Sequence, residues 1–515
     1  MNISSNNFNV ARPAAAPQAA ANSAPQAETK EFTHNAQDPK VHNNDTISLS
    51  VNNDNGKLST DSVKLENKKA VFVFGQLVGL RPDPSYKLTP GADGNFVYPE
   101  GHEKATGSIA FSAVANTVNK FNQVSEEITG KEIEWAFGKK QLTVSPETGE
   151  WPNAFYARQM EGVHFFDYKS ISTGDSGEVA SHEAGHAILD AVRPGYLEGT
   201  GAETGAFHEA FGDNLAMLMT LQNDTSIAKI VQQTGGTGDI SSGPNLLSDM
   251  GEGFGKELGL GDHGIRTMLN SFTYKDPATL PERGDKDNLG HEVHDFARLW
   301  AGAFYDVVDG ISDANRAAGM SPEAALKSAG EESFKLLVGQ LNQSPKNSET
   351  TFKEMAGHLV AADAAYNNGA RADIIKDVMV RRELLSAESA SGLFKSEPIA
   401  FSGKTVERDH TFGADAGALA GVKFSTTTEQ PMFGILPVNN SVASEAEKGA
   451  KLMLQNDQIL FTDKAPEMKD LFRPDGSVYK AYVAPNEKGE QELQRVAIVS
   501  CSHGHEHVAG HDHNH

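Results

Sequence analysis

Cysteine is almost absent from this sequence of 515 residues, which contains a single one, Cys501. One cysteine cannot form a disulfide within the chain, and it cannot supply the ligands of a cysteine-rich zinc site. Any metal ion that the protein binds must therefore be held by histidine and carboxylate side chains. A run of 18 apolar residues is also lacking, so we expect no membrane-spanning helix.

Positive charge is scarce, because 45 Lys and Arg residues stand against 69 Asp and Glu residues and leave a net charge of −24 at pH 7. This acidic balance argues against nucleic acid or an anionic membrane surface as a partner. The first 30 residues lack the basic start and apolar run of a secretory signal peptide. We therefore expect the protein to stay in the cytoplasm or to be secreted by a signal-peptide-independent route. No oligomeric state is indicated.

Composition and periodicity divide the chain into five segments. Residues 1–67 are polar and nearly free of aromatic side chains, so we expect disorder there, since such a segment buries too little apolar surface to offset its ordering entropy. Strand-like and helical patterns follow at 68–192, and helical spacing dominates 193–386. Short strand candidates between turns indicate a small β-rich appendage at 387–500. The remaining residues, 501–515, form a histidine-rich tail.

Helices are expected at 178–192, 204–222, 293–309, 322–341, 349–366 and 370–386.

The stretch ASHEAGHAILDA, residues 180–191, carries two histidines four residues apart. On a helix, residues at this spacing lie one turn apart on one face, so His182 and His186 can share one Zn²⁺. Glu183 lies beside the first histidine, where its carboxylate can reach a water at the metal rather than the metal. Gly185 leaves room for a ligand or another backbone to approach. Taken alone, however, such a helix is usually structural.

A catalytic zinc ion needs three protein ligands and one open coordination position. The next expected helix offers Glu209 as the third ligand, and Asp213 lies four residues further on, on the same face. An aspartate there can accept the free ring N–H of a ligating histidine and fix its tautomer. The alternative is that both carboxylates are ordinary surface charges. Their closeness to the HEAGH motif favours the metal-binding interpretation.

HEAGH, followed by GAFHEAFGD, resembles the thermolysin family of zinc metallopeptidases, whose motifs are HExxH and a downstream GAxNExxSD. Three further segments match in the order of the family: NAFYARQM (153–160), GIRTM (264–268) and EVHDFARLWAGAFY (292–305). The resemblance covers roughly residues 68–386. It implies an α+β, two-lobed fold with a β-rich N-terminal lobe at 68–192 and a helical C-terminal lobe at 193–386. The active-site helix would lie along the floor of the cleft between them.

The same resemblance implies a zinc-dependent endopeptidase that acts on a peptide or protein substrate. Glu183 would then be the base that transfers a proton from water to the leaving amine. His294 would stabilise the transition state, and Tyr196 would stabilise the oxyanion. Asp287 is the candidate for the aspartate that orients His294 in the family.

Five residues are implied to bind the substrate. Asn153 and Ala154 match a pair on an edge strand that aligns the substrate backbone, and Arg266 matches an arginine that binds a substrate carbonyl. Val179 and Ile265 match positions that line the pocket for the residue after the scissile bond. Apolar lining predicts cleavage before bulky hydrophobic residues, as a preference rather than a strict rule.

Several positions depart from the family pattern. His208 stands where the family usually has asparagine, so the support of the second ligand histidine is expected to differ. Glu178 matches a calcium ligand, but Thr220 replaces a glutamate at another ligand position. The resemblance therefore implies one catalytic Zn²⁺ and leaves Ca²⁺ open.

The tail, HGHEHVAGHDHNH, supports two interpretations. Closely spaced imidazoles on a flexible chain bind Zn²⁺, Ni²⁺ or Cu²⁺, so the tail is a candidate accessory site that gathers metal for the active site. An inert polar terminus is the alternative. The histidines concerned are His503, His505, His507, His511, His513 and His515.

Two other functions compete with the peptidase. The first is a non-catalytic zinc-binding or carrier protein on the same scaffold. The second is an interaction protein in which the N-terminal segment and the appendage carry the function and the peptidase region is inactive. Glu183 distinguishes these alternatives from an enzyme, because a site that only binds zinc has no need of a base beside it.

Overall fold

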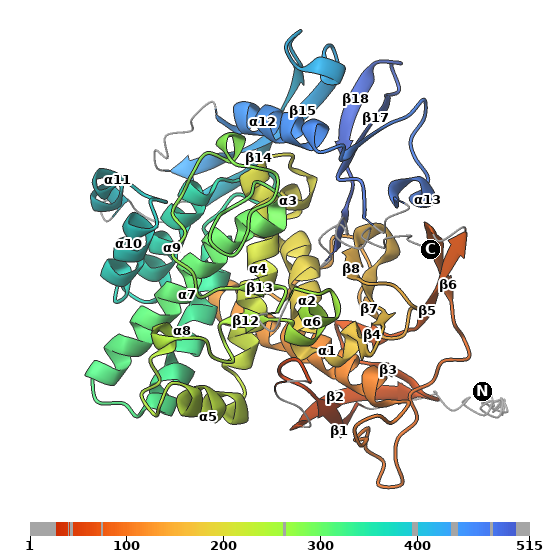
Figure 1. The fold of residues 1–515 in the computed structure, drawn as a ribbon, viewed down its shortest axis with the longest axis vertical. Helices are drawn as coiled ribbons and strands as arrows, with labels where there is room; N and C mark the ends of the chain where they lie inside the picture. The colour runs from red at the N-terminus through yellow and green to blue at the C-terminus, as the bar shows by residue number, and fades with distance from the viewer. Residues whose placement is uncertain are drawn as a thin grey trace, which may run out of the picture.

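The computed structural model describes residues 27–39, 41, 45–73, 76–260, 264–393, 400–433, 441–473 and 477–500. They form a β-rich half, a helical half and a C-terminal domain that lies against both (Figure 1). The fold is thus of mixed α/β type. The candidate accessory histidines of the tail lie outside the described residues.

An eight-stranded sheet forms the β-rich half, with the strand order β1-β2-β3-β4-β7-β9-β8-β19. Helix α1 (Ala105–Thr129) packs between this sheet and the helical half, in contact with β1, β4 and the helices α2 (Gly177–Val192) and α8 (Pro322–Asn342). The strands of the sheet are β1 (Glu28–His34), β2 (Asp45–Asp54), β3 (Lys57–Ser59), β4 (Val63–Leu65), β7 (Leu142–Ser145), β8 (Ala154–Ala157), β9 (Gly162–Phe165) and β19 (Ile498–Ser500).

Three short antiparallel pairs accompany the main sheet: β5 (Lys68–Val73) with β6 (Gln76–Pro82), β10 (Asp167–Tyr168) with β11 (Ile171–Ser172), and β12 (Asp249–Met250) with β13 (Arg266–Thr267).

The expectation that residues 1–67 are disordered is wrong for the part that the structure describes, because β1 to β4 lie there. In β2 the buried positions, Leu49 and Val51, alternate with exposed ones. A strand with one buried face needs an apolar side chain only at every second position, so a polar composition does not exclude it. Phe32 of β1 is fully buried and stacks on Phe96, with ring centroids 4.9 Å apart. Residues 1–26 lie outside the described range.

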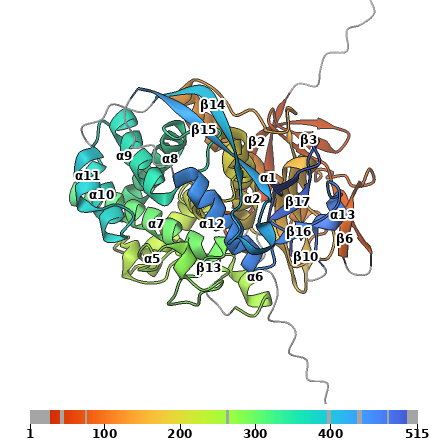
Figure 2. The same cartoon turned by 90° about the horizontal axis from the view of Figure 1, so that it is seen from above.

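The C-terminal domain comprises the described residues between 400 and 500. Its five-stranded sheet has the order β14-β15-β18-β17-β16 and its own hydrophobic cluster, which includes Phe424 and Leu419. Seen from above, the domain lies over the line where the β-rich and helical halves meet (Figure 2). Its elements are β14 (Ala400–Thr411), β15 (Lys423–Phe433), α12 (Ser441–Gln455), β16 (Ile459–Phe461), α13 (Met468–Leu471), β17 (Ala481–Pro485) and β18 (Gln491–Arg495).

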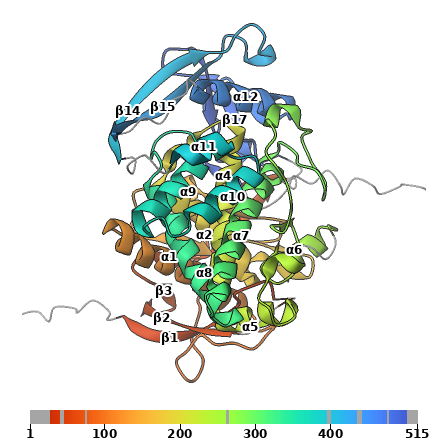
Figure 3. The same cartoon turned by 90° about the vertical axis from the view of Figure 1, so that its left-hand side faces the viewer.

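The helical half is built from long helices that pack side by side (Figure 3). The main ones are α2 (Gly177–Val192), α4 (Ala202–Thr220), α7 (Val293–Ala317), α8 (Pro322–Asn342), α9 (Phe352–Tyr366) and α10 (Ala372–Arg381). The shorter ones are α3 (Pro194–Glu198), α5 (Asp224–Gln233), α6 (Glu252–Glu257) and α11 (Ala387–Gly392). Through the described ranges, none of the helices combines the length and the apolar character needed to span a bilayer.

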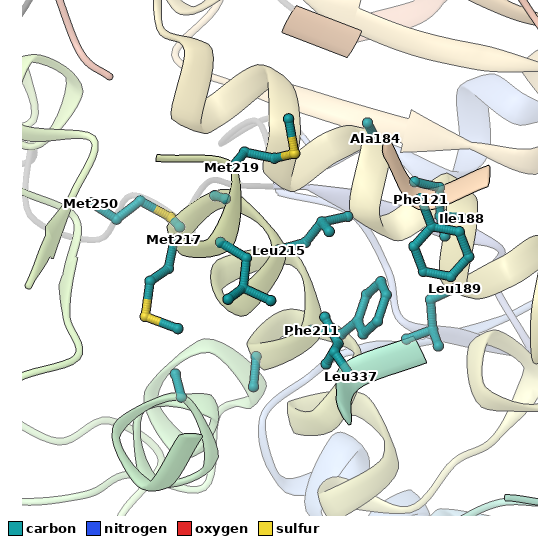
Figure 4. Close-up of a cluster of buried hydrophobic side chains, with 14 of the residues drawn as sticks. Phe121, Ala184, Ile188, Leu189, Phe211, Leu215, Met217, Met219, Met250 and Leu337 are labelled. Atoms are coloured by element: carbon teal, nitrogen blue, oxygen red, sulfur yellow. The ribbon is translucent and has the colours of Figure 1, made fainter. Parts of the chain in front are cut away.

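Helices α2 and α4 are fixed by a continuous apolar core (Figure 4). Phe121 of α1 meets Phe211 of α4 edge to face, with centroids 6.4 Å apart. Ile188 of α2 and Leu215 of α4 are fully buried in the same cluster. Each such side chain contributes about 1.5–3 kcal/mol through burial. The two helices that carry the expected metal ligands therefore have a fixed relative position.

Candidate metal centre

Helix α2 carries both histidines of the HEAGH motif. It begins after Ser176, whose hydroxyl accepts the backbone N–H of Val179 at 3.3 Å, as an N-cap serine does. His182 and His186 lie on one face, with ring centroids 4.5 Å apart and ring planes at 83°. Both imidazoles are fully buried.

Two glycines allow α2 and α4 to approach each other closely. A Cβ at Gly185 would lie 3.0 Å from Cα of Gly212, and a Cβ at Gly212 would lie 2.6 Å from Nδ1 of His182. The open side of Gly185, which was expected to face a ligand or another backbone, therefore faces the backbone of α4. This contact brings Glu209 of α4 within reach of the two imidazoles.

His182, His186 and Glu209 form a cluster that fits the ligand set of an HExxH motif with a downstream glutamate. Oε2 of Glu209 lies 3.5 Å from Nε2 of His182 and 3.8 Å from Nε2 of His186. Across the described ranges this is the one group in which three such ligand atoms lie within 4.8 Å of one another. Nε2 of His186 and Oε2 of Glu209 are buried, and neither has a hydrogen-bond partner in the described part of the chain. Buried ligand atoms in this state fit a metal ion.

The protonation states also fit metal binding. Burial lowers the pKa of His186 well below its usual value, so its imidazole is neutral near pH 7. Burial alone would raise the pKa of Glu209, but the neighbouring histidines, with His294 first among them, hold it well below the usual value. Metal ligands must be deprotonated, and both residues are.

Asp213 lies where the sequence predicts it, next to the first histidine. Its Oδ1 is 2.9 Å from Nδ1 of His182. Arg266 donates to the same carboxylate, from Nε at 2.9 Å and from Nη2 at 2.7 Å. The structure thus places Arg266, expected to bind a substrate carbonyl, in a buried ion pair with Asp213.

His186 has an unusual neighbour at its other ring nitrogen. Nδ1 of His208 lies 2.9 Å from Nδ1 of His186, so one ring donates and the other accepts. Burial lowers the pKa of His208 to about 3, so this ring is also neutral. The histidine found in place of the family's asparagine therefore contacts the second ligand directly.

His294 reaches the cluster from the first turn of α7, and its Nε2 lies 3.3 Å from Oε2 of Glu209. Its Nδ1 lies 2.8 Å from Oε1 of Glu292. The expected partner Asp287 is instead exposed, 3.5 Å from Lys286. The residue whose carboxylate contacts His294 is therefore Glu292 and not Asp287. Glu292 is the N-cap residue of α7, so its side chain turns towards the first turn of the helix, where His294 lies. An acidic residue two positions before a histidine at a helix start was the available signal.

The net effect of these carboxylates on His294 is to raise its pKa. Burial lowers it, but Glu209 and Glu292 raise it by more. The ring therefore holds protons on both nitrogens more readily than a free histidine.

The two other catalytic candidates differ in their surroundings. Glu183 is fully buried on α2, directly after His182. Tyr196 lies in α3 with its hydroxyl 3.5 Å from Sδ of Met355 and its ring 5.9 Å from that of Phe207. The polar side chains of Ser344 and Thr350 also lie within hydrogen-bonding reach of Tyr196, and its expected role at an oxyanion stays a prediction.

Asn153 and Ala154 lie at the start of β8, and both are fully buried. The expected edge strand is not an edge, because β8 pairs with β9 on one side and with β19 on the other. The sequence could not indicate this, since β19 comes more than 300 residues after β8.

Val179 and Ile265 both lie beside Gly251, where a Cβ would be 3.9 Å from Val179 Cγ2 and 3.2 Å from Ile265 Cγ1. A cavity of 290 Å³ adjoins Val179 and is lined by residues such as Ile109, Ile171 and Phe254. Ile265 and the three metal-binding residues are not among its lining residues.

The position implied to bind calcium is a buried group of carboxylates. Oε2 of Glu178 accepts the backbone N–H of Gly251 at 3.1 Å. Burial and the nearby Glu252 raise the pKa of Glu178 well above its usual value. Thr220, which replaces a glutamate, accepts a hydrogen bond from Nε2 of Gln37 at 2.5 Å. Calcium binding stays a prediction.

No protein-family model and no curated protein sequence matches the chain. Among solved structures, the chain is similar to the precursor of protealysin, a metalloproteinase from Serratia proteamaculans, with a TM-score of 0.34 and 15% sequence identity over 65% of this chain and 90% of that chain. A similarity of this size does not assign an activity, so the chemistry of the site has to carry the functional conclusion.

Proposed function

We propose that this protein is a zinc-dependent endopeptidase that hydrolyses peptide or protein substrates, preferably before bulky hydrophobic residues. The observation that supports this most directly is the buried cluster of His182, His186 and Glu209, with His294 3.3 Å from Glu209. Two imidazoles and a carboxylate are the ligand set of many catalytic zinc sites.

Each residue of the centre has a role in this reaction. A zinc ion supplies Lewis-acid chemistry when bound, because it makes water more acidic and polarises a peptide carbonyl. His182, His186 and Glu209 would hold it. Glu183 accepts a proton from the attacking water at its carboxylate and passes that proton to the leaving nitrogen.

His294 acts on the charge that develops on the carbonyl oxygen. Glu292 holds Nδ1, so Nε2 is the ring nitrogen turned towards the cluster. A protonated Nε2 donates a hydrogen bond to the developing oxyanion, which is worth about 3–4 kcal/mol where such a donor is preorganised. The carboxylate of Glu292 favours this protonation state, because it contributes to raising the pKa of His294.

The preference for a bulky hydrophobic residue after the scissile bond rests on Val179 and Ile265, which lie beside the same glycine and are both apolar. Arg266 keeps Asp213 ionised, because the guanidinium offsets the effect of burial and lowers the pKa of Asp213. Its contact with a substrate carbonyl remains a proposal.

A zinc-binding protein without catalysis is the main alternative, and Glu183 decides between the two. Wild type, Glu183→Gln and the surface control Glu126→Gln would each be loaded with Zn²⁺ and assayed for zinc content and for cleavage of a peptide library. We expect one Zn²⁺ per chain in all three, and cleavage lost by at least 100-fold only in Glu183→Gln. Zinc binding with cleavage unaffected by Glu183→Gln would contradict the proposed mechanism.

A further inference from the structure

The last described strand of the chain lies on the strand that is expected to align the substrate. β19 pairs with β8 in antiparallel register, Ile498 opposite Ala157, Val499 opposite Tyr156 and Ser500 opposite Phe155. The carbonyl of Ala497 accepts the backbone N–H of Arg158 at 3.2 Å. Since bonded pairs alternate in an antiparallel ladder, the next exchange of hydrogen bonds falls at Tyr156 and Val499. A peptide that adds to a sheet edge would use these same backbone groups of β8.

The direction of β19 brings it towards the expected substrate-aligning pair. Ser500 faces Phe155, so the next positions along β8 are Ala154 and then Asn153. The backbone N–H of Arg158 and the backbone groups of Tyr156 on this side of β8 are therefore already bonded to the chain itself.

Side chains reinforce this pairing on the β-rich half. Ile498 and Val496 belong to a buried cluster with Trp151 and Phe155. Phe472 of the C-terminal domain completes it, with its ring centroid 5.9 Å from that of Trp151. The strand is thus anchored by apolar packing as well as by its backbone.

The C-terminal domain also contacts the helical half. The hydroxyl of Thr200 donates to the carbonyl of Ala446 in α12 at 3.1 Å. Gly449 of α12 lies so close that a Cβ there would overlap the carbonyl oxygen of Thr200. Nδ2 of Asn456 lies 2.9 Å from Nε2 of His291, which directly precedes Glu292, the N-cap residue of α7. The domain therefore contacts both the β-rich half and the helical half, and the helical half carries the metal centre.

The metal centre is closed to solvent. His182, Glu183 and His186 are 0% exposed, and Glu209 and His294 are 1% exposed. Peptide hydrolysis requires access for both water and an extended substrate.

We propose that the C-terminal domain is an intramolecular inhibitor of the metal centre, with β19 occupying the edge of β8 in the manner of an extended peptide. The domain has to undock before a substrate can pair with β8. This inference rests on the proposed function for the nature of the substrate.

The contact at Gly449 allows the domain to be undocked without unfolding it. Gly449→Ala adds a methyl group that collides with backbone at Thr200, while alanine stabilises helix α12 itself by about 1 kcal/mol. The matched control is Gly357→Ala in α9, where the added Cβ would meet only a side-chain atom of Leu393 at the ordinary distance of 3.7 Å.

Binding is measured separately from catalysis. In the zinc-loaded Glu183→Gln background, the affinity for a fluorescein-labelled decapeptide rich in Leu and Phe would be determined by anisotropy. We expect Gly449→Ala to tighten binding at least tenfold and Gly357→Ala to leave it unchanged. With Glu183 intact, Gly449→Ala should also raise the rate of cleavage at least tenfold. Equal affinity with and without Gly449→Ala would overturn the inhibitor role.

A second variant acts on the strand rather than on the helix. Val499→Pro removes the backbone N–H that faces Tyr156. Glu487→Pro is its control, because Glu487 is the second residue of the turn that begins at Asn486, a position where proline is favoured. Val499→Pro should give the same gain in affinity, and a folded variant without that gain would contradict the role of β19. Tighter binding without cleavage in any variant would refute the peptidase function and leave the inhibitor role intact.

Discussion

Glu292 contacts His294 twice, because Oε1 lies 2.8 Å from the ring Nδ1 and Oε2 accepts the backbone N–H of the same residue at 2.9 Å. One carboxylate therefore caps helix α7 and fixes the orientation of the imidazole. The ring cannot rotate about its side-chain bonds without breaking the contact at Nδ1. Glu292 is a positioning residue for His294 in the proposed reaction.

Replacing Glu292 with glutamine should reduce kcat by about 10–100-fold with little change in KM, because the substitution loosens a group that acts in the transition state. The upper limb of the pH profile of kcat should shift to lower pH, since Glu292 contributes to the raised pKa of His294. Asp287→Asn is the control, and kinetics for both are measured in the Gly449→Ala background. An equal loss in Asp287→Asn, or no shift of the profile in Glu292→Gln, would contradict this role.

Asp213 should govern the affinity for zinc rather than the chemistry. Its carboxylate lies 2.9 Å from Nδ1 of His182 and also pairs with Arg266. Asp213→Asn removes the charge from both contacts, and loss of such a partner weakens metal binding by about 10–100-fold. Competition with a chromogenic chelator measures the Kd, with Asp306→Asn, which pairs with Arg382, as the control. An unchanged Kd would show that Asp213 serves packing alone.

The sequence could predict those parts of the site that depend on local helix spacing. His182, His186, Glu183 and Glu209 lie on two helices with regular spacing, so the sequence was sufficient to place them on facing helices. Glu292 was missed in favour of Asp287, although both are acidic and near His294. The choice depended on which residue caps α7, and capping geometry is set by the backbone before the helix.

Non-local pairing accounts for the larger errors in the fold. The strands β1 to β4 gain their stability from the sheet that they join, and a half-buried strand has few apolar residues of its own. The pairing of β19 with β8 joins residues far apart in the chain, so no local pattern of β8 could indicate that its edge was covered.

The close approach of α2 and α4 makes Gly212 sensitive to any side chain. A Cβ there would lie 2.6 Å from Nδ1 of His182, the atom that contacts Asp213. We expect Gly212→Ala to displace the imidazole and to weaken zinc binding at least 100-fold. Gly357→Ala, again in a helix but with room for a methyl group, should bind zinc as wild type does. Retention of wild-type affinity in a folded Gly212→Ala would show that the helices can separate without cost.

His34 should make the fold sensitive to acid, away from the metal centre. It is buried against Ser112, with Nδ1 3.1 Å from Oγ, and burial lowers its pKa to about 4, partly opposed by Asp45. In the unfolded chain a histidine titrates near 6.5. The unfolded state therefore binds a proton at a higher pH than the folded state does. The difference in pKa therefore contributes about 3 kcal/mol to the free energy of unfolding. This contribution is fully present above pH 6.5 and is lost as the pH falls towards 4.

The substitution His34→Gln isolates this contribution, because an amide can still hydrogen-bond Ser112 but does not titrate. Urea unfolding of the zinc-free protein at pH 7 and pH 4.5 gives the loss of unfolding free energy between the two values. Other buried histidines, such as His358 with a pKa of about 3, contribute to that loss in both proteins and cancel in the difference. The loss should be about 2–3 kcal/mol smaller in His34→Gln than in wild type. Equal losses would mean that His34 stays charged in the folded state or is reached by water.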